Sequence, residues 1–162
     1  SLTTFTECWA ITKYRNVSRP PANTPGSSLT WMDIDFPIFR LAEQYLIYAE
    51  AVLRGGAGGD AATALNYMNL IRVRAYGNTS GNIAAGQLNL AYILDERARE
   101  LYWEGFRRSD LIRYGQFTTA AYIWPWKGGV SGGTSVSANR NIYPIPSNDI
   151  VANPNLVQNP GY

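Results

Sequence analysis

Three glutamates, Glu96, Glu100 and Glu104, recur at every fourth position and therefore share one face of any helix that contains them. Two carboxylates that flank a glycosidic bond can hydrolyse it, one as acid and the other as base or nucleophile. The same spacing also suits an ion-pair cluster, because every acid has an arginine within helical reach. The cluster is the favoured interpretation, and its members besides the glutamates are Arg97, Arg99, Arg107, Arg108, Asp110 and Arg113.

A second group of residues has the composition of a recognition surface. Trp124 and Trp126 flank a proline and precede Lys127, and the proline restricts the backbone that presents the two indoles. Indole faces suit the C–H faces of sugars, and the indole N–H can donate to hydroxyl groups. The interpretation that these residues favour by themselves is that both tryptophans fill a core beneath a long loop, and a contact with sugar is the second one. Trp124, Trp126 and Lys127 are the candidate ligand-binding residues.

The composition excludes many other chemistries. The chain has no histidine and one cysteine, Cys8, so imidazole catalysis, an internal disulfide and a cysteine-rich zinc site are all ruled out. Asp33 and Asp35 are too few for the six to eight oxygen ligands that calcium takes. A net charge of +2 without a basic run gives no footprint for nucleic acid. Carboxylate-based acid–base catalysis and oxygen-ligated calcium or magnesium survive these exclusions, as does binding without chemistry.

The elements that must position these residues are mostly helices. Apolar residues at steps of three and four predict helices from about 40 to 53, from 61 to 76 with Asp60 as N-cap, from about 90 to 104, and from about 108 to 114. The first two form a tetratricopeptide-like hairpin. Residues 1–36 read as irregular or extended, 37–115 as helical and 116–162 as a loop-rich segment. No stretch is long and apolar enough for a transmembrane helix, Ser1–Ala10 has no signal-peptide pattern, and Cys8 is expected to be buried.

Several stretches together resemble the C-terminal region of the SusD/RagB family of outer-membrane nutrient-binding lipoproteins. In chain order they are 36–51 (FPIFRLAEQYLIYAEA), 69–75 (NLIRVRA), 93–115 (ILDERARELYWEGFRRSDLIRYG), 143–146 (YPIP) and 153–162 (NPNLVQNPGY). The resemblance covers about residues 36–162 and makes the whole chain the C-terminal portion of one SusD-like domain.

The resemblance implies a mainly α fold, in which tetratricopeptide-like pairs support long irregular loops packed on them. It also implies a protein that is not an enzyme, with no catalytic or metal-ligating residue and no cofactor. Such a protein binds glycan, starch-like or another polysaccharide or oligosaccharide, at the bacterial cell surface. The expected partner is a SusC-type TonB-dependent outer-membrane transporter, and a lipid anchor is expected on a part of the protein that precedes this chain. A helical-repeat scaffold that binds peptide or protein is the alternative function.

Overall fold

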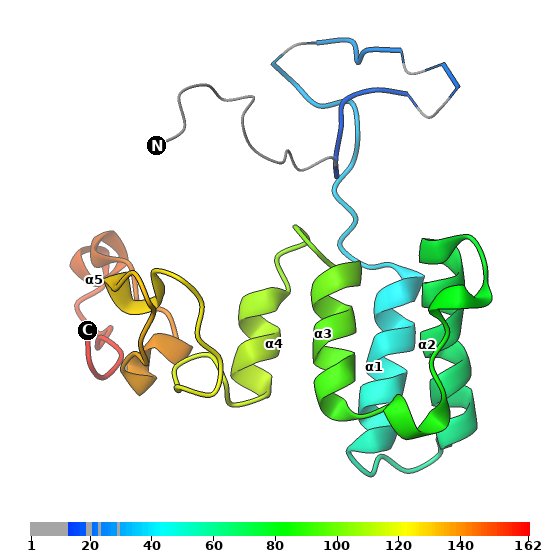
Figure 1. The fold of residues 1–162 in the computed structure, drawn as a ribbon. Helices are drawn as coiled ribbons and strands as arrows, with labels where there is room; N and C mark the ends of the chain where they lie inside the picture. Colours follow the sequence, from blue (N-terminus) through cyan, green and yellow to red (C-terminus); the bar gives the residue numbers. More distant parts are fainter. Residues whose placement is uncertain (1–12, 19–20, 23, 29) are drawn as a thin grey trace. The chain divides into compact units, whose positions relative to one another are not determined.

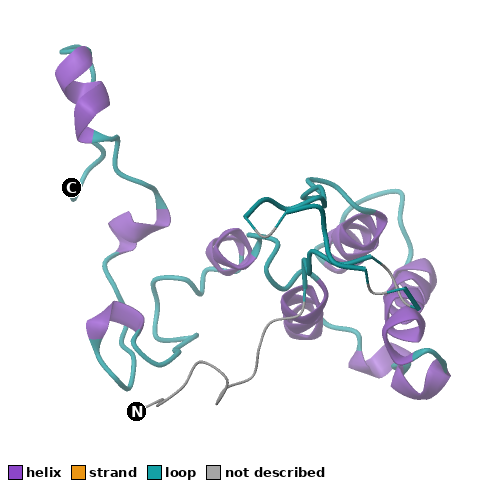
Figure 2. Cartoon of the chain, turned by 90° about the horizontal axis from the view of Figure 1, so that it is seen from above, coloured by secondary structure: helices purple, strands orange, loops and turns teal. Residues whose placement is uncertain are grey.

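The computed structural model describes residues 13–18, 21–22, 24–28 and 30–162 of the chain. The chain divides into two compact units, residues 1–85 and 86–162. In the described ranges five α-helices and several short 3-10 turns are present, and no strand is formed (Figure 2). The predicted fold class, mainly α with long irregular loops, is confirmed. The boundaries predicted at 36/37 and 115/116 stay a prediction.

The first unit contains two antiparallel helices, α1 (Leu41–Leu53) and α2 (Ala61–Tyr76), joined by a short turn (Figure 1). Between the helices Tyr45 and Tyr67 stack at 4.3 Å between ring centroids, and Tyr48 meets Tyr67 edge-on at 5.1 Å. The buried apolar residues of the two helices are Leu46, Ala49, Ala64, Met68 and Ile71. The predicted helical hairpin is therefore present.

Local chemistry explains where α2 begins and ends. The carboxylate of Asp60 accepts the backbone N–H of Thr63 at 2.8 Å and its hydroxyl at 2.7 Å, so Asp60 is the predicted N-cap. These two donors lower the pKa of the Asp60 carboxyl. Gly77 ends the helix at φ 73°, in the left-handed region that glycine adopts without a steric cost.

The residues immediately before α1 expose a series of large apolar side chains. Apolar spacing places Leu41 on the same helix face as Leu46 and Ala49, but Leu41 is 63% exposed whereas Leu46 and Ala49 are buried. Leu41 is the first residue of its helix, one position after the extended N-cap Arg40, so the apolar face of α1 is buried only from its second turn. The other strongly exposed apolar side chains of this segment are Trp31, Met32, Phe36, Ile38 and Phe39. The first twelve residues of the segment predicted to be irregular or extended lie outside the described residues, and so does Cys8, which was predicted to be buried.

The second unit begins with α3 (Leu90–Glu100) and α4 (Arg107–Arg113). The prediction that α3 continues to Glu104 is wrong, because the chain turns between the two helices. Trp103 at φ 63° and Gly105 at φ 82° adopt left-handed backbone conformations, which a helix cannot contain.

The remaining residues of the second unit are largely irregular, as predicted, except for α5 (Ser147–Ala152). This short helix was missed, because six residues show no measurable apolar period. Hydrogen bonds from side chains to the backbone, rather than helices or strands, fix this part of the chain. Gln158 exchanges two hydrogen bonds with the backbone of Ile145, at 2.8 and 2.9 Å, and the Tyr162 hydroxyl donates to the carbonyl of Ile142 at 2.8 Å.

Candidate ligand-binding site

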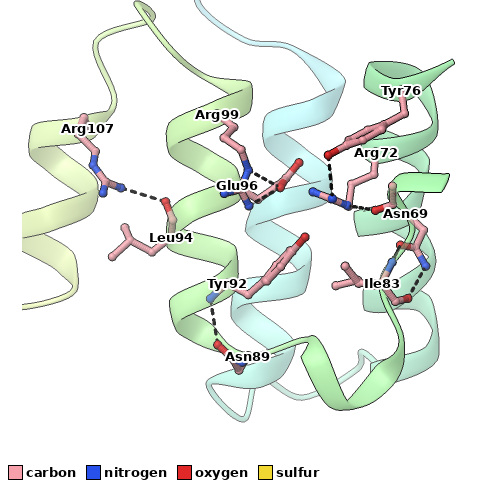
Figure 3. Close-up of polar contacts among 11 residues, drawn as sticks. Asn69, Arg72, Tyr76, Ile83, Asn89, Tyr92, Leu94, Glu96, Arg99 and Arg107 are labelled. Carbon is pink, nitrogen blue, oxygen red and sulfur yellow. Dashed lines mark hydrogen bonds and ion pairs between the residues drawn. The ribbon is translucent and has the colours of Figure 1, made fainter. Parts of the chain in front are cut away.

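The charged cluster joins α3 to α4. Arg97 donates through Nε to Asp110 Oδ1 at 2.8 Å, and the two side chains are only 3% and 2% exposed. Arg113 donates to the same oxygen at 2.9 Å, and Arg107 donates to the carbonyl oxygen of Leu94 at 2.9 Å (Figure 3 shows the latter bond). Because these bonds hold two helices together across a turn, the residues serve as structure.

The three glutamates are enclosed as well. Glu96 receives two hydrogen bonds from Arg99, at 2.7 and 3.0 Å (Figure 3), while Glu100 and Glu104 are buried. Burial opposes the charge of Arg99, but the bond and the charge of Glu96 outweigh it, so the net shift of the Arg99 pKa is upward. A glycoside hydrolase needs two carboxylates that reach the substrate. All three acids are removed from solvent, so the structure favours the ion-pair cluster over hydrolysis.

Lys127 lies at the centre of the loop that follows α4. Its side chain is 2% exposed, and Nζ donates to the carbonyl oxygens of Thr119 at 2.7 Å and Tyr122 at 2.6 Å. Nζ also lies 4.8 Å from the centroid of the Trp124 ring. The backbone of Lys127 bonds to Trp124 on one side and to Thr134 on the other. Lys127 therefore fixes the loop that presents the two tryptophans.

The two tryptophans have different surroundings. Trp124 is half-buried, with its ring 6.2 Å from that of Phe117 and 6.0 Å from that of Tyr122. Trp126 is 69% exposed and has φ 68°, a conformation that is strained for a bulky residue. Gly133, at φ 76°, lies where a Cβ would collide with the carbonyl of Trp124, so the loop closes only around a glycine. The three candidate residues therefore lie in one loop, and the indole of Trp126 is largely exposed.

A hollow of about 650 Å³ lies beside Trp124 and Lys127, within the second unit. Phe117, Tyr143 and Tyr162 supply further aromatic walls, and Arg108 and Arg140 supply cations. Small-molecule sites commonly measure roughly 300–1,000 Å³ and combine apolar walls with a few polar groups. The sequence did not reveal this grouping, because its residues are spread over more than fifty positions and share no periodicity. Trp126 is not among the lining residues.

Asp33, one of the two aspartates that are too few for calcium, forms hydrogen bonds within a turn of the chain. Its carboxylate accepts the backbone N–H of Ser27 at 2.5 Å and the Ser27 hydroxyl at 2.6 Å. These bonds lower the pKa of Asp33. No group of three or more histidine, cysteine, aspartate or glutamate residues that could hold a metal ion is found among the residues the structure describes.

A hollow of this size with aromatic walls and a few cations has the features that small-molecule sites of binding proteins commonly have. The sequence profile described as the SusD family matches residues 3–162, and the chain belongs to that family. It is 44% identical over 158 residues to the starch-binding protein SusD of Bacteroides thetaiotaomicron, an alignment that covers 98% of this chain and 27% of that protein. A crystal structure of a SusD superfamily protein from Bacteroides vulgatus matches with a TM-score of 0.60 and 33% identity, over 86% of this chain and 31% of that one.

Two predictions can be assessed directly from this membership. The resemblance to the SusD/RagB family is confirmed, and proteins of the family are non-catalytic binding proteins, in agreement with the prediction that the chain is not an enzyme. The chain spans only about a quarter to a third of the length of these two relatives. Over the described part of the chain, no helix is both long and apolar enough to cross a membrane.

Proposed function

We propose that the chain is part of a glycan-binding protein of the bacterial cell surface, which captures oligosaccharide or polysaccharide, starch-like or of another kind, without chemical change. The observation that carries this proposal is the 44% identity to a starch-binding protein over nearly the whole chain. Membership of the SusD family supports a surface-exposed location at the outer membrane, held by a lipid anchor. A SusC-type TonB-dependent transporter is the proposed recipient of the glycan.

The ligand contacts proposed within this chain are Trp126 and the side of Trp124 that faces the hollow. An exposed indole offers an apolar face to a sugar ring together with an N–H donor. The Lys127 ammonium donates to two carbonyls, so its proposed part is to hold the loop at the edge of the hollow. Strain at a bulky residue, as at Trp126, often marks a functional position.

Titration with maltoheptaose tests the proposal. We expect quenching of tryptophan fluorescence, and the Trp126→Ala variant should bind about tenfold more weakly or worse, as for an anchoring tryptophan. The matched control is Trp31→Ala, which removes an indole that is 76% exposed in the other unit. Equal loss in both variants, or none in Trp126→Ala, would contradict the proposed contact, and the absence of binding to any glycan would contradict the function.

A scaffold that binds peptide or protein is the second candidate. It is favoured by one observation, the exposed apolar side chains from Trp31 to Leu41 that precede the α1–α2 hairpin. Contiguous exposed apolar surface commonly marks a protein interaction site. In the titration above, the scaffold predicts no response to any glycan.

A further inference from the structure

We infer that the hollow selects glycans that carry carboxylate groups, such as uronic-acid oligosaccharides, over neutral ones. The inference rests on the proposed glycan-binding function and specifies its class of ligand. Three cations, Arg108, Lys127 and Arg140, line the hollow, and no aspartate or glutamate does.

The charges of these three cations are not compensated by acids. Elsewhere in the second unit Arg97, Arg99 and Arg113 each form an ion pair with a carboxylate. Among the residues that the structure describes, the three cations of the hollow instead contact carbonyl oxygens and aromatic rings. Few acids are available to pair with the cations of the hollow, because the segment 116–162 contains two basic residues and a single acid, Asp149. The side chains that line the hollow therefore carry a net positive charge.

The Arg108 guanidinium is held in place before any ligand arrives. Its central carbon lies 3.9 Å from the Tyr143 ring centroid and 5.1 Å from that of Phe117. One of its terminal nitrogens, Nη2, donates to the carbonyls of Arg140 at 2.8 Å and Asn141 at 3.3 Å. Neutral acceptors leave the charge intact, and a fixed guanidinium loses little entropy when it binds a carboxylate. This arrangement resembles a prepared anion site.

Arg140 supplies a second set of donors. It is exposed, and its guanidinium lies over the Tyr162 ring at 5.7 Å. An arginine fork matches the two oxygens of a carboxylate, and such charge-assisted bonds are about twice as strong as neutral ones. The aromatic walls, Phe117 and Trp124, suit the C–H face of the same sugar. A uronate residue combines both features, whereas a neutral hexose would have the walls and only neutral hydrogen bonds to the arginines.

Calorimetry on the full 162-residue chain with trigalacturonate and its methyl ester tests the inference. The two probes have the same sugar framework and differ in charge. We expect the acid to bind more tightly than the ester. We also expect Arg140→Gln to weaken binding of the acid about tenfold and to leave binding of the ester unchanged, as for the loss of one charged hydrogen-bonding partner. Arg140 is exposed, so this variant should fold. Arg140→Lys, which keeps the charge without the fork, should retain part of the affinity.

Arg15→Gln is the matched control, because Arg15 is exposed and lies in the other unit. Equal affinity for acid and ester, with neutral maltoheptaose bound as well, would overturn the charge selection and leave the proposed function intact. Equal loss of binding in Arg15→Gln and Arg140→Gln would also overturn it, since attraction would then depend on net charge. The absence of binding to every sugar would overturn both the inference and the proposed function.

Discussion

Removing the carboxylate of Asp110 should be among the most damaging single changes in the second unit. Asp110 accepts from Arg97 and from Arg113, and the Arg97–Asp110 pair is nearly inaccessible to water. In Asp110→Asn the charge of Arg97 remains buried without its carboxylate. Breaking a buried pair by removing one partner typically costs about 3–5 kcal/mol, a large part of the roughly 5–15 kcal/mol that stabilises a small domain.

The measurement is urea denaturation followed by circular dichroism, with Asp95→Asn as the control. Asp95 is an exposed acid on α3, so the control removes the same charge from a solvated position and should cost no more than about 0.5 kcal/mol. The double variant Arg97→Met/Asp110→Leu should be more stable than Asp110→Asn, because the charge of Arg97 is then removed together with that of Asp110.

Two results would refute this reasoning. If Asp110→Asn cost as little as Asp95→Asn, the pair would be solvated in the folded protein and would not join α3 to α4. If the double variant were less stable than Asp110→Asn, the charges themselves, and not their mutual compensation, would stabilise the unit. Either outcome would also reopen a chemical role for the acids of this cluster.

Two further predictions concern a loop and a helix end. Lys127→Met should leave the carbonyls of Thr119 and Tyr122 without the Nζ donor and lower the free energy of unfolding by about 1–3 kcal/mol. Hydrogen exchange should accelerate in residues 116–137 and stay unchanged in α1 and α2. Uniform acceleration would contradict a local role. Asp60→Ala should lower the melting temperature at pH 7, and the difference from wild type should shrink as the pH falls below about 4. The pKa of Asp60 is lowered in the folded protein. The carboxylate therefore stabilises the fold above the ordinary carboxyl pKa, and this stabilisation is lost as the pH falls through the folded-state pKa. A difference in melting temperature that does not depend on pH would refute the capping role.

Periodicity and capping rules predicted most of the regular structure. The bounds of α1 and α2 follow from apolar spacing, the Asp60 cap and the glycines after each helix. The rules failed where the backbone departs from helical geometry at a residue that gives no warning. Trp103 adopts φ 63° although tryptophan has no preference for that region, so nothing in the sequence marked the end of α3.

The candidate site was predicted only in part, and the reason is distance along the chain. Trp124, Trp126 and Lys127 are adjacent, so their grouping was visible. The other cations of the hollow, Arg108 and Arg140, are separated by 32 positions and meet through a hydrogen bond from a guanidinium to a backbone carbonyl. Such a bond needs no particular residue type at the acceptor, and therefore leaves no pattern in the sequence.

Dissolved salt should affect two groups of cations in the second unit differently. In α3 and α4, Arg97 and Asp110 form a buried pair, and buried pairs are screened little by dissolved ions. In the loop-rich segment Arg140 is exposed and has no carboxylate partner among the described residues, so its attraction for an anionic ligand is open to screening. Raising the salt concentration should therefore weaken the binding of trigalacturonate well before it affects the free energy of unfolding. If both fell together, the ligand and the helix pair would depend on the same charges, and the separation between a structural cluster and a binding hollow would not hold.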